Sequence, residues 1–298
     1  MRALLSGILA AVTACFAAAL VLALVAPGAG AEVYEPQVVG GDGVPSGRYP
    51  FVASIQSSRV GTPSGHFCGG TLIDRDSVLT AAHCAEIIGP RPTAERLSYR
   101  EVRVVVGRTV LSSGQGQVRR IESLSDVRIH PGYRNFAFDA AVINLDRPVS
   151  GIRPVRLATP RQDFLERPGR EVTAAGWGNT VPQSLVDAIF GTGSLRVPNR
   201  MQEVSVPVVA DRFAEQTYNA ADLTPPFIPR LMVAAGDSDL DTCQGDSGGP
   251  LFDRTGRGYT QIGITSFGVG CGVLNFPGVY TEVNAPKVRA FIVRAAGL

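Results

Sequence analysis

The chain alternates short apolar runs with glycine and proline, and this alternation constrains its fold most strongly. Its 298 residues include 34 glycines and 21 prolines, which favour frequent turns over long helices. Most runs are bounded by Gly, Pro, Ser or Asn, as β-strands are. The clearest β-rich runs are Phe51–Ile55, Val102–Val106, Ala140–Leu145, Glu171–Ala174 and Tyr259–Thr265. Many short strands with glycine-rich turns predict an all-β barrel or sandwich.

One helix is expected within this β pattern, together with one candidate linker and one stretch that could be helical. A terminal amphipathic helix is predicted over residues 284–297, with Asn284 as its cap and Pro286 in its first turn. Its apolar face and its stop would be Val288, Phe291, Ile292, Ala295 and then Gly297. Ser150–Pro160 is a candidate linker between two strand-rich halves. Ser184–Leu240 has no clean period, although Ala210–Ala221 could be helical.

The N-terminus has the pattern of an export signal. Arg2 precedes an apolar run from Leu4 to Val25, and Ala29-Gly30-Ala31 is an A-x-A cleavage signal. We therefore expect a signal peptide over 1–31 and a secreted, extracellular product. Two alternatives remain open, namely a retained membrane anchor and a lipoprotein modified at Cys15. No other segment approaches 18 continuous apolar residues, so we expect the remainder to be soluble.

Composition excludes other classes. With 45% hydrophobic and 18% charged residues, the chain is not a disordered protein. A net charge of +2 without a long basic run argues against nucleic-acid binding. Five cysteines are awkward for a secreted protein, but Cys15 leaves with the signal peptide. The other four allow three disulfide connectivities, and a zinc site is disfavoured because no C-x₂-C pair occurs.

The stretch from Gln244 to Pro250, QGDSGGP, carries the clearest chemistry. Glycines on both sides allow a sharp turn that exposes Ser247 and lets backbone N–H groups approach a substrate closely. A serine hydroxyl is a poor nucleophile alone and needs a neighbouring base that is itself oriented by a third group. The chain must therefore supply a histidine and a buried carboxylate elsewhere.

Among the three histidines, His83 is the best candidate base, because it follows a strand-like run and precedes Cys84. His66 and His130 lie in Gly- or Pro-rich contexts without such an anchor. Asp139 directly precedes the largely apolar run Ala140–Leu145 and would therefore lie at the mouth of a largely buried strand. An ordinary surface role for Asp139 stays open, and Asp126 and Asp146 are rivals by proximity.

These motifs resemble the trypsin-like serine proteases of the chymotrypsin family. Eight pieces match in the family's order and span nearly all of Val38–Leu298: VVGG at 38–41, CGGTLI at 68–73, TAAHC at 80–84, FDAAV at 138–142, GWG at 176–178, QGDSGGP at 244–250, SFG at 266–268 and PGVYT at 277–281. The resemblance implies two six-stranded antiparallel barrels, roughly 38–155 and 156–283, with the active site between them and the terminal helix after them. It also implies an enzyme without a cofactor or a metal.

The resemblance assigns a catalytic triad. His83 would be the general base and later the acid, Asp139 would orient the imidazole, and Ser247 would attack the scissile carbonyl. The backbone N–H groups of Gly245 and Ser247 would form the oxyanion hole.

The resemblance also implies a specificity pocket. Asp241, six residues before Ser247, would lie at its floor and favour Arg or Lys before the cleaved bond. Ser266, Gly268 and Gly278 would line its walls, while Phe267 stands where the family usually has Trp. In an alternative reading, Asp241 is one acid of an exposed loop that also holds Asp237 and Asp239.

The remaining implied features concern maturation and bridges. Cleavage between Gln37 and Val38 would remove a propeptide over 32–37 and free an α-amine that pairs with the buried Asp246. Because Gln37 is not basic, we expect a separate activating protease. The family pattern selects the bridges Cys68–Cys84 and Cys243–Cys271, which require an oxidising compartment.

The leading hypothesis is thus a secreted trypsin-like endopeptidase, made as a zymogen over 38–298 and expected to be monomeric. Its expected partners are protein or peptide substrates with Arg or Lys before the scissile bond, and the family adds proteinaceous inhibitors as a further class. Two alternatives stay open. One is chymotrypsin- or elastase-like specificity, and the other is a non-catalytic homologue that uses the same barrels for binding.

Overall fold

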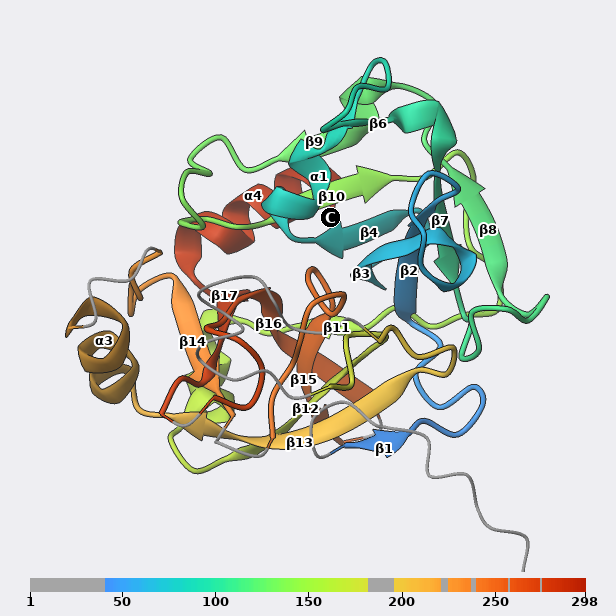
Figure 1. Cartoon of the computed structure of the whole chain (residues 1–298). Coiled ribbons are helices and arrows are strands. Elements are labelled where there is room, and N and C mark those ends of the chain that lie inside the picture. The colour runs from blue at the N-terminus through green and yellow to red at the C-terminus, as the bar shows by residue number, and fades with distance from the viewer. Residues whose placement is uncertain (1–40, 182–195, 221–224, 237–239, 257, 274) are drawn as a thin grey trace, which may run out of the picture. The chain divides into compact units, whose positions relative to one another are not determined.

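Strands dominate the computed structural model of the chain, which describes residues 41–181, 196–220, 225–236, 240–256, 258–273 and 275–298 (Figure 1). All of these belong to Pro36–Leu298, one of the two compact units into which the chain divides. The predicted signal peptide and propeptide lie outside the described residues. None of the described helices is long and apolar enough to cross a membrane.

The first sheet has seven strands in the order β8-β7-β2-β3-β4-β10-β9. Its edge strands β8 and β9 are not hydrogen-bonded to each other within the described chain, so the sheet curls without closing. Its strands are β2 (Val52–Ser57), β3 (His66–Leu72), β4 (Ser77–Thr80), β7 (Val102–Val106), β8 (Gln117–Arg120), β9 (Val127–Ile129) and β10 (Ala141–Asn144). A separate parallel pair joins β5 (Ile88–Gly89) to β6 (Leu97–Ser98).

The second sheet closes on itself, because β13 pairs with both β12 and β14 around the ring β13-β12-β15-β16-β17-β14. Two short strands attach outside this ring, β1 (Asp42–Gly43) on β13 and β11 (Arg156–Leu157) on β16. The ring strands are β12 (Glu171–Gly176), β13 (Gln202–Val209), β14 (Met232–Ala235), β15 (Pro250–Thr255), β16 (Gly258–Phe267) and β17 (Gly278–Glu282). Burial alternates along β13, as expected for a strand with one face in a core.

The all-β prediction is confirmed, with one closed six-stranded barrel and one curled sheet in place of two closed barrels. Each of the five predicted β-rich runs overlaps a strand of the structure. Ser150–Pro160 does connect the two sheets and is held by both, since the Val155 N–H donates to the Leu72 carbonyl and the Ala158 N–H to the Gln261 carbonyl.

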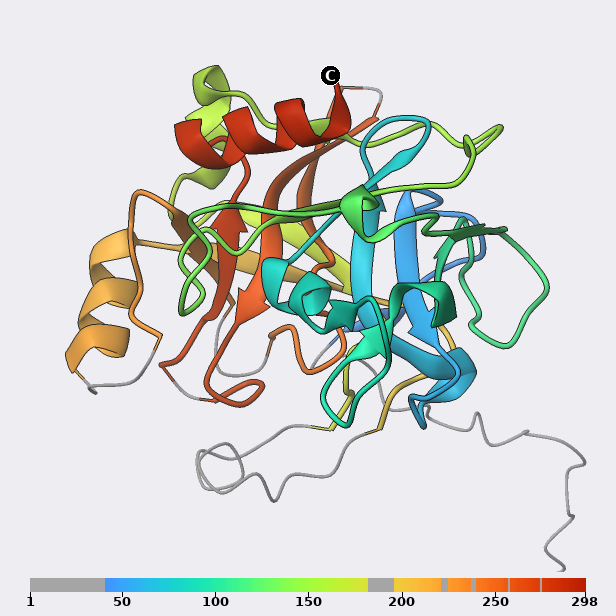
Figure 2. The same ribbon diagram turned by 90° about the horizontal axis from the view of Figure 1, so that it is seen from above.

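The helices are few and short. They are α1 (Ala82–Glu86), α3 (Asp211–Ala220) and α4 (Pro286–Ala296), with 3₁₀ turns at Pro63–Gly65, Tyr99–Glu101, Leu124–Asp126 and Pro160–Glu166. The helix expected within Ala210–Ala221 is therefore present as α3. Although α4 follows the second sheet in the chain, it packs beside β10 of the first (Figures 1 and 2). The Asn144 side-chain amide also donates to the Ala295 carbonyl.

The terminal helix begins and ends almost as predicted. Pro286 occupies the first turn, and Gly297 at the C-cap has a φ of 75°, a left-handed conformation that glycine adopts without strain. The prediction that Asn284 caps the helix is wrong. Ala285 is the N-cap residue and makes no side-chain cap, while the Asn284 amide donates to Asp163 instead, at 2.8 Å.

Candidate functional site

Strand pairing brings His83 and Asp139 together. Strands β4 and β10 are antiparallel neighbours in which Thr80 pairs with Ala141. The chain leaves β4 into α1, which carries His83, and enters β10 just after Asp139. The end of one strand and the start of the next therefore meet, although the two residues are 56 positions apart.

The contact between them has the geometry of a base and its orienting carboxylate. His83 Nδ1 lies 2.8 Å from Asp139 Oδ2, and the His83 backbone N–H donates to Oδ1 at 2.9 Å. Asp139 is fully buried, whereas the His83 side chain keeps 22% of its surface exposed. The imidazole is thus held from behind while its other edge faces solvent.

Ser266 was expected to line the specificity pocket, and the structure gives it a second contact. It does line the pocket that contains His83 and Ser247. Its hydroxyl, however, donates to Asp139 Oδ2 at 2.5 Å. The buried carboxylate therefore accepts hydrogen bonds from three donors, which is how a buried anion avoids a large desolvation penalty.

The rival carboxylates lie in other environments. Asp126 accepts hydrogen bonds from the Ser123 hydroxyl and backbone N–H, and it closes a capping box at a 3₁₀ turn. Asp146 pairs with Arg147 on the surface and accepts the Arg120 backbone N–H. Neither of these contacts involves a histidine.

The serine stretch forms a tight turn that enters β15. The Asp246 N–H donates to the Cys243 carbonyl at 2.9 Å, and the Ser247 carbonyl accepts the Gly69 N–H from β3 at 2.8 Å. Gly248 has a φ of 80°, and a Cβ added there would lie 2.2 Å from the Thr80 hydroxyl. Only glycine fits between the turn and the first sheet at that position.

Ser247 and His83 line one pocket of about 230 Å³. The bridge from Cys68 to Cys84 lies beside them, with Cys84 Sγ 3.6 Å from His83 Nε2 and 3.5 Å from the Ser247 carbonyl oxygen. The predicted base and the predicted nucleophile therefore line the same pocket.

Two backbone N–H groups at this turn have no acceptor among the described residues. In the described part of the chain, neither Gly245 nor Ser247 donates its N–H to a protein acceptor. Gly245 has a φ of 103°, which holds its peptide in a conformation that glycine alone adopts readily. A pair of unused donors beside a serine hydroxyl can bind an oxygen that becomes negative during reaction.

Asp241 lies beside Gly278, a residue of the pocket lining, and is only 1% exposed. The reading of Asp241 as an acid of an exposed loop is therefore wrong. Asp237 and Asp239 lie outside the described residues. The Gly272 N–H donates to Asp241 Oδ2 at 3.2 Å, and a Cβ added to Gly278 of the pocket wall would come within 2.6 Å of Oδ1.

The Asp241 charge also acts on its aromatic neighbours. Burial raises the pKa of the Tyr218 and Tyr280 hydroxyls well above their usual value, and the Asp241 carboxylate raises both pKa values further. The Tyr218 hydroxyl donates to the Pro277 carbonyl at 2.7 Å. Both tyrosines thus stay neutral beside the buried Asp241 carboxylate.

Asp246 is a second buried carboxylate, 3% exposed. Its Oδ1 accepts the Gly178 N–H at 2.8 Å and its Oδ2 accepts the Cys243 N–H at 3.1 Å. Burial raises its pKa to about 6, although the two backbone donors lower it. Val38, its predicted partner, lies outside the described residues.

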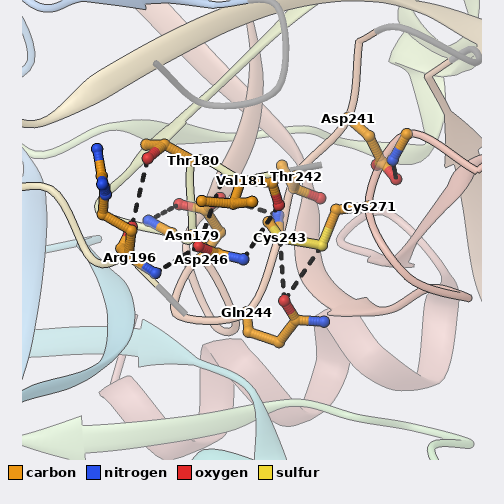
Figure 3. The surroundings of a disulfide bond; sticks show 12 residues. Asn179, Thr180, Val181, Arg196, Asp241, Thr242, Cys243, Gln244, Asp246 and Cys271 are labelled. Atoms are coloured by element: carbon orange, nitrogen blue, oxygen red, sulfur yellow. Dashed lines mark hydrogen bonds between the residues drawn. A yellow bond between two sulfur atoms is a disulfide. The ribbon is translucent and has the colours of Figure 1, made fainter. Parts of the chain in front are cut away.

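The second bridge joins Cys243 to Cys271, with their Cα atoms 5.2 Å apart (Figure 3). Both bridges are those that the resemblance implied, and all four thiols are used in them. The side-chain oxygen of Gln244 lies 3.0 and 3.2 Å from the two sulfurs of the second bridge. The bridge and the serine turn are therefore packed together.

Phe136 also lines the pocket of His83 and Ser247, although the sequence did not predict it there. Its ring centroid lies 5.4 Å from that of His83 and 5.5 Å from that of Phe267. The backbone of Phe136 is in the left-handed region, with a φ of 62°. Asn135 and Phe138 are in the same region, with φ values of 48° and 55°. Three non-glycine residues with positive φ just before Asp139 give this loop an uncommon backbone conformation, which no local sequence pattern indicates.

Comparisons with known proteins agree with this geometry. Residues 38–292 match the family described as Trypsin. The chain is 36% identical over 253 residues to a trypsin of Saccharopolyspora erythraea, covering 83% of this chain and 94% of that protein. It is 32% identical over 276 residues to a trypsin-like protease of Streptomyces glaucescens, covering 90% and 86%.

One of the relatives has a name that is not that of a protease. The chain is 32% identical over 262 residues to the venom peptide isomerase heavy chain of Agelenopsis aperta, covering 83% of this chain and 96% of that protein. The family match nevertheless extends over most of the chain and includes every described residue of the site. The chain therefore belongs to the trypsin family and is a serine endopeptidase, a hydrolase of peptide bonds.

Proposed function

We propose that this protein is a secreted endopeptidase that cuts after Arg or Lys through an acyl-enzyme on Ser247. The observation that carries the proposal is the buried Asp139 bound to His83 Nδ1 at 2.8 Å, with the opposite edge of the ring facing the pocket that holds Ser247. This arrangement leaves His83 Nε2 as the ring atom able to take a proton from a nucleophile.

In the first half of the reaction, Ser247 Oγ forms a bond to the scissile carbonyl carbon while its proton passes to His83 Nε2. Asp139 stabilises the resulting imidazolium, and the Gly245 and Ser247 N–H groups bind the negative oxygen. His83 then donates the proton to the leaving amine as the C–N bond breaks. Water repeats the sequence on the acyl-enzyme and releases the acid.

The substrate side chain before the cleaved bond would enter the pocket above Asp241. A carboxylate that is 1% exposed gains most from a cation that replaces its lost solvation. Gly268 and Gly278 leave the walls without side chains, so a long arginine or lysine can pass. Phe267 and Phe136 supply apolar surface at the mouth.

A peptide panel tests the reaction and the preference together. Chromogenic substrates that differ only in the residue before the cleaved bond are compared for the activated enzyme, and Arg and Lys are expected to be cleaved fastest. Asp241→Ser should remove this preference, whereas Asp239→Asn, a matched change in the same stretch of sequence, should keep it. Faster cleavage after Phe or Leu than after Arg contradicts the proposed specificity.

The nucleophile is tested separately. A fluorophosphonate probe should label wild-type protein at Ser247, and Ser247→Ala should lose both label and turnover. Absence of labelling in the processed protein would favour the non-catalytic homologue.

We also propose synthesis as a zymogen that another protease activates. The amine of Val38, freed by cleavage after Gln37, would pair with Asp246, a buried carboxylate that has only backbone donors in the described chain. Purified precursor incubated alone should stay intact by mass spectrometry, because an enzyme selective for basic residues does not cut after Gln37. Rapid self-cleavage at the Gln37–Val38 bond refutes this.

N-terminal sequencing of exported material tests secretion, and a start at Met1 or Cys15 contradicts cleavage after Ala31.

A further inference from the structure

His66 is a buried histidine that the proposed reaction does not use. It begins strand β3, is 1% exposed, and its ring lies against Trp177 with centroids 5.4 Å apart. Its two nitrogens have different partners, the Ser54 hydroxyl for Nδ1 at 2.8 Å and the Gly245 carbonyl for Nε2 at 3.0 Å. Gly245 is one of the two residues whose N–H groups form the proposed oxyanion hole.

The hydrogen bonds around His66 can run in only one direction while the ring is neutral. Burial lowers the pKa of His66 to about 4, although the Gly245 carbonyl raises it, so the ring has one donor and one acceptor at neutral pH. A carbonyl oxygen can only accept, hence Nε2 carries the proton and Nδ1 accepts from Ser54. The Ser54 oxygen in turn accepts from Gln56 Nε2 at 3.0 Å.

This relay is anchored rigidly in the first sheet. Ser54 and Gln56 lie on β2, both are buried, and Gln56 is the cross-strand partner of His66. Gly69 lies further along β3, the strand that His66 begins, and its N–H donates to the Ser247 carbonyl at 2.8 Å. Strand β3 therefore holds the carbonyls of both residues that would supply oxyanion donors, one through His66 and one through its own backbone.

We infer that His66 is a positioning residue for the oxyanion hole, acting through its Nε2–H bond to the Gly245 carbonyl. The inference rests on the proposed function, since it assigns a role to the same two N–H groups. Fixing the carbonyl of Gly245 restricts the backbone of this residue, whose φ is 103° and whose N–H has no acceptor in the described chain. Such fixed donors contribute to catalysis because they need not reorganise as charge develops.

The test uses two ligands with the same peptide sequence, taken from the best substrate of the panel. A peptide boronate forms a tetrahedral adduct on Ser247 and places an oxygen in the oxyanion hole, whereas the peptide amide occupies only the substrate pockets. His66→Phe should lower kcat about 10–100-fold, since losing one whole oxyanion donor costs about 10²–10³-fold. Boronate affinity should fall by a similar factor, while KM and amide affinity stay within about threefold.

Three further variants separate positioning from structural damage. His66→Gln carries an amide N–H that can reach the Gly245 carbonyl. It should therefore recover at least about a third of the decrease in log kcat that His66→Phe causes. Val104→Ala, a core change in β7 of the same sheet, should lower stability without changing the ratio of boronate to amide affinity. Ser54→Ala should lower kcat only a few-fold, and it should add nothing in the His66→Phe background.

Nitrogen NMR of the wild-type protein supplies a measurement that needs no variant, and it should show His66 neutral at pH 7 with its proton on Nε2. A proton on Nδ1, an unchanged kcat in His66→Phe, or equal losses of boronate and amide affinity each overturn the inference. Failure of the proposed function looks different, because wild-type protein would then bind no boronate and Ser247→Ala would not change turnover.

Discussion

Adding a side chain at Gly268 should close the specificity pocket without disturbing the fold. A Cβ built at Gly268 meets nothing closer than 3.7 Å, the Gly270 carbonyl oxygen, and the backbone there is outside the left-handed region. In Gly268→Val the branched side chain would therefore stand in the pocket that Gly268 lines. Arginine could no longer reach the buried carboxylate.

The size of the effect follows from the lost ion pair. Removing one partner from a buried ion pair costs about 3–5 kcal/mol, which is a factor of about 10²–10³ or slightly more in kcat/KM. The assay compares kcat/KM for two peptides with Arg or Ala before the cleaved bond. The Arg peptide should lose this factor while the Ala peptide keeps its rate within about threefold, and the melting temperature should stay within about 2 °C.

Gly278→Ala is the matched contrast at a neighbouring glycine of the same pocket. Its Cβ would lie 2.6 Å from Asp241 Oδ1 and 3.3 Å from the Ala235 carbonyl oxygen, so the fold must shift to admit it. We expect lower stability and lower rates on both peptides. If Gly268→Val cleaves the Arg peptide at more than a tenth of the wild-type rate, the wall does not confine the substrate as argued.

Three further predictions concern carboxylates. Asp139→Asn should lower kcat about 10⁴-fold, as in the chymotrypsin-type triad, because an amide N–H cannot accept the His83 Nδ1–H bond and the wrong tautomer results. Stopped assays at high enzyme concentration measure this kcat, and a loss under tenfold would exclude Asp139 as the residue that orients His83. Ser266→Ala removes one of the donors to Asp139 and should lower kcat about threefold to thirtyfold with little change in KM; an effect on KM alone would assign Ser266 to substrate binding only. Burial, with the Glu282 charge adding to it, raises the pKa of Glu166 to about 9, so the folded state binds this proton more tightly than the unfolded chain and stability falls as pH rises from about 4.5 to 9. Glu166→Gln should therefore raise the melting temperature by about 2–4 °C at pH 8 but not at pH 4, and an equal gain at both pH values would contradict this sign.

The fold could be predicted in outline because strand signals are local. Apolar β-rich runs bounded by turn residues predicted β2, β7, β10, β12 and β16, and helical spacing predicted α4. The cap at Asn284 failed because a competing partner, Asp163, comes from a turn more than a hundred residues away in the chain. Barrel closure is also non-local, since it depends on the pairing of β13 with β14 at one end and the absence of a β8–β9 pairing among the described strands of the other sheet.

The sequence by itself determined which residues have the required chemistry. A serine among glycines and one histidine beside a cysteine indicated Ser247 and His83 as candidates, because local sequence sets turns, strand ends and functional groups. The resemblance to the family's motifs added Asp139. Only the tertiary structure decided how they meet, since the antiparallel register of β4 and β10 places Asp139 behind His83. The structure likewise buried Asp241 beside Gly278 and connected His66 to Gly245, which are contacts between distant segments that packing creates and no local pattern encodes.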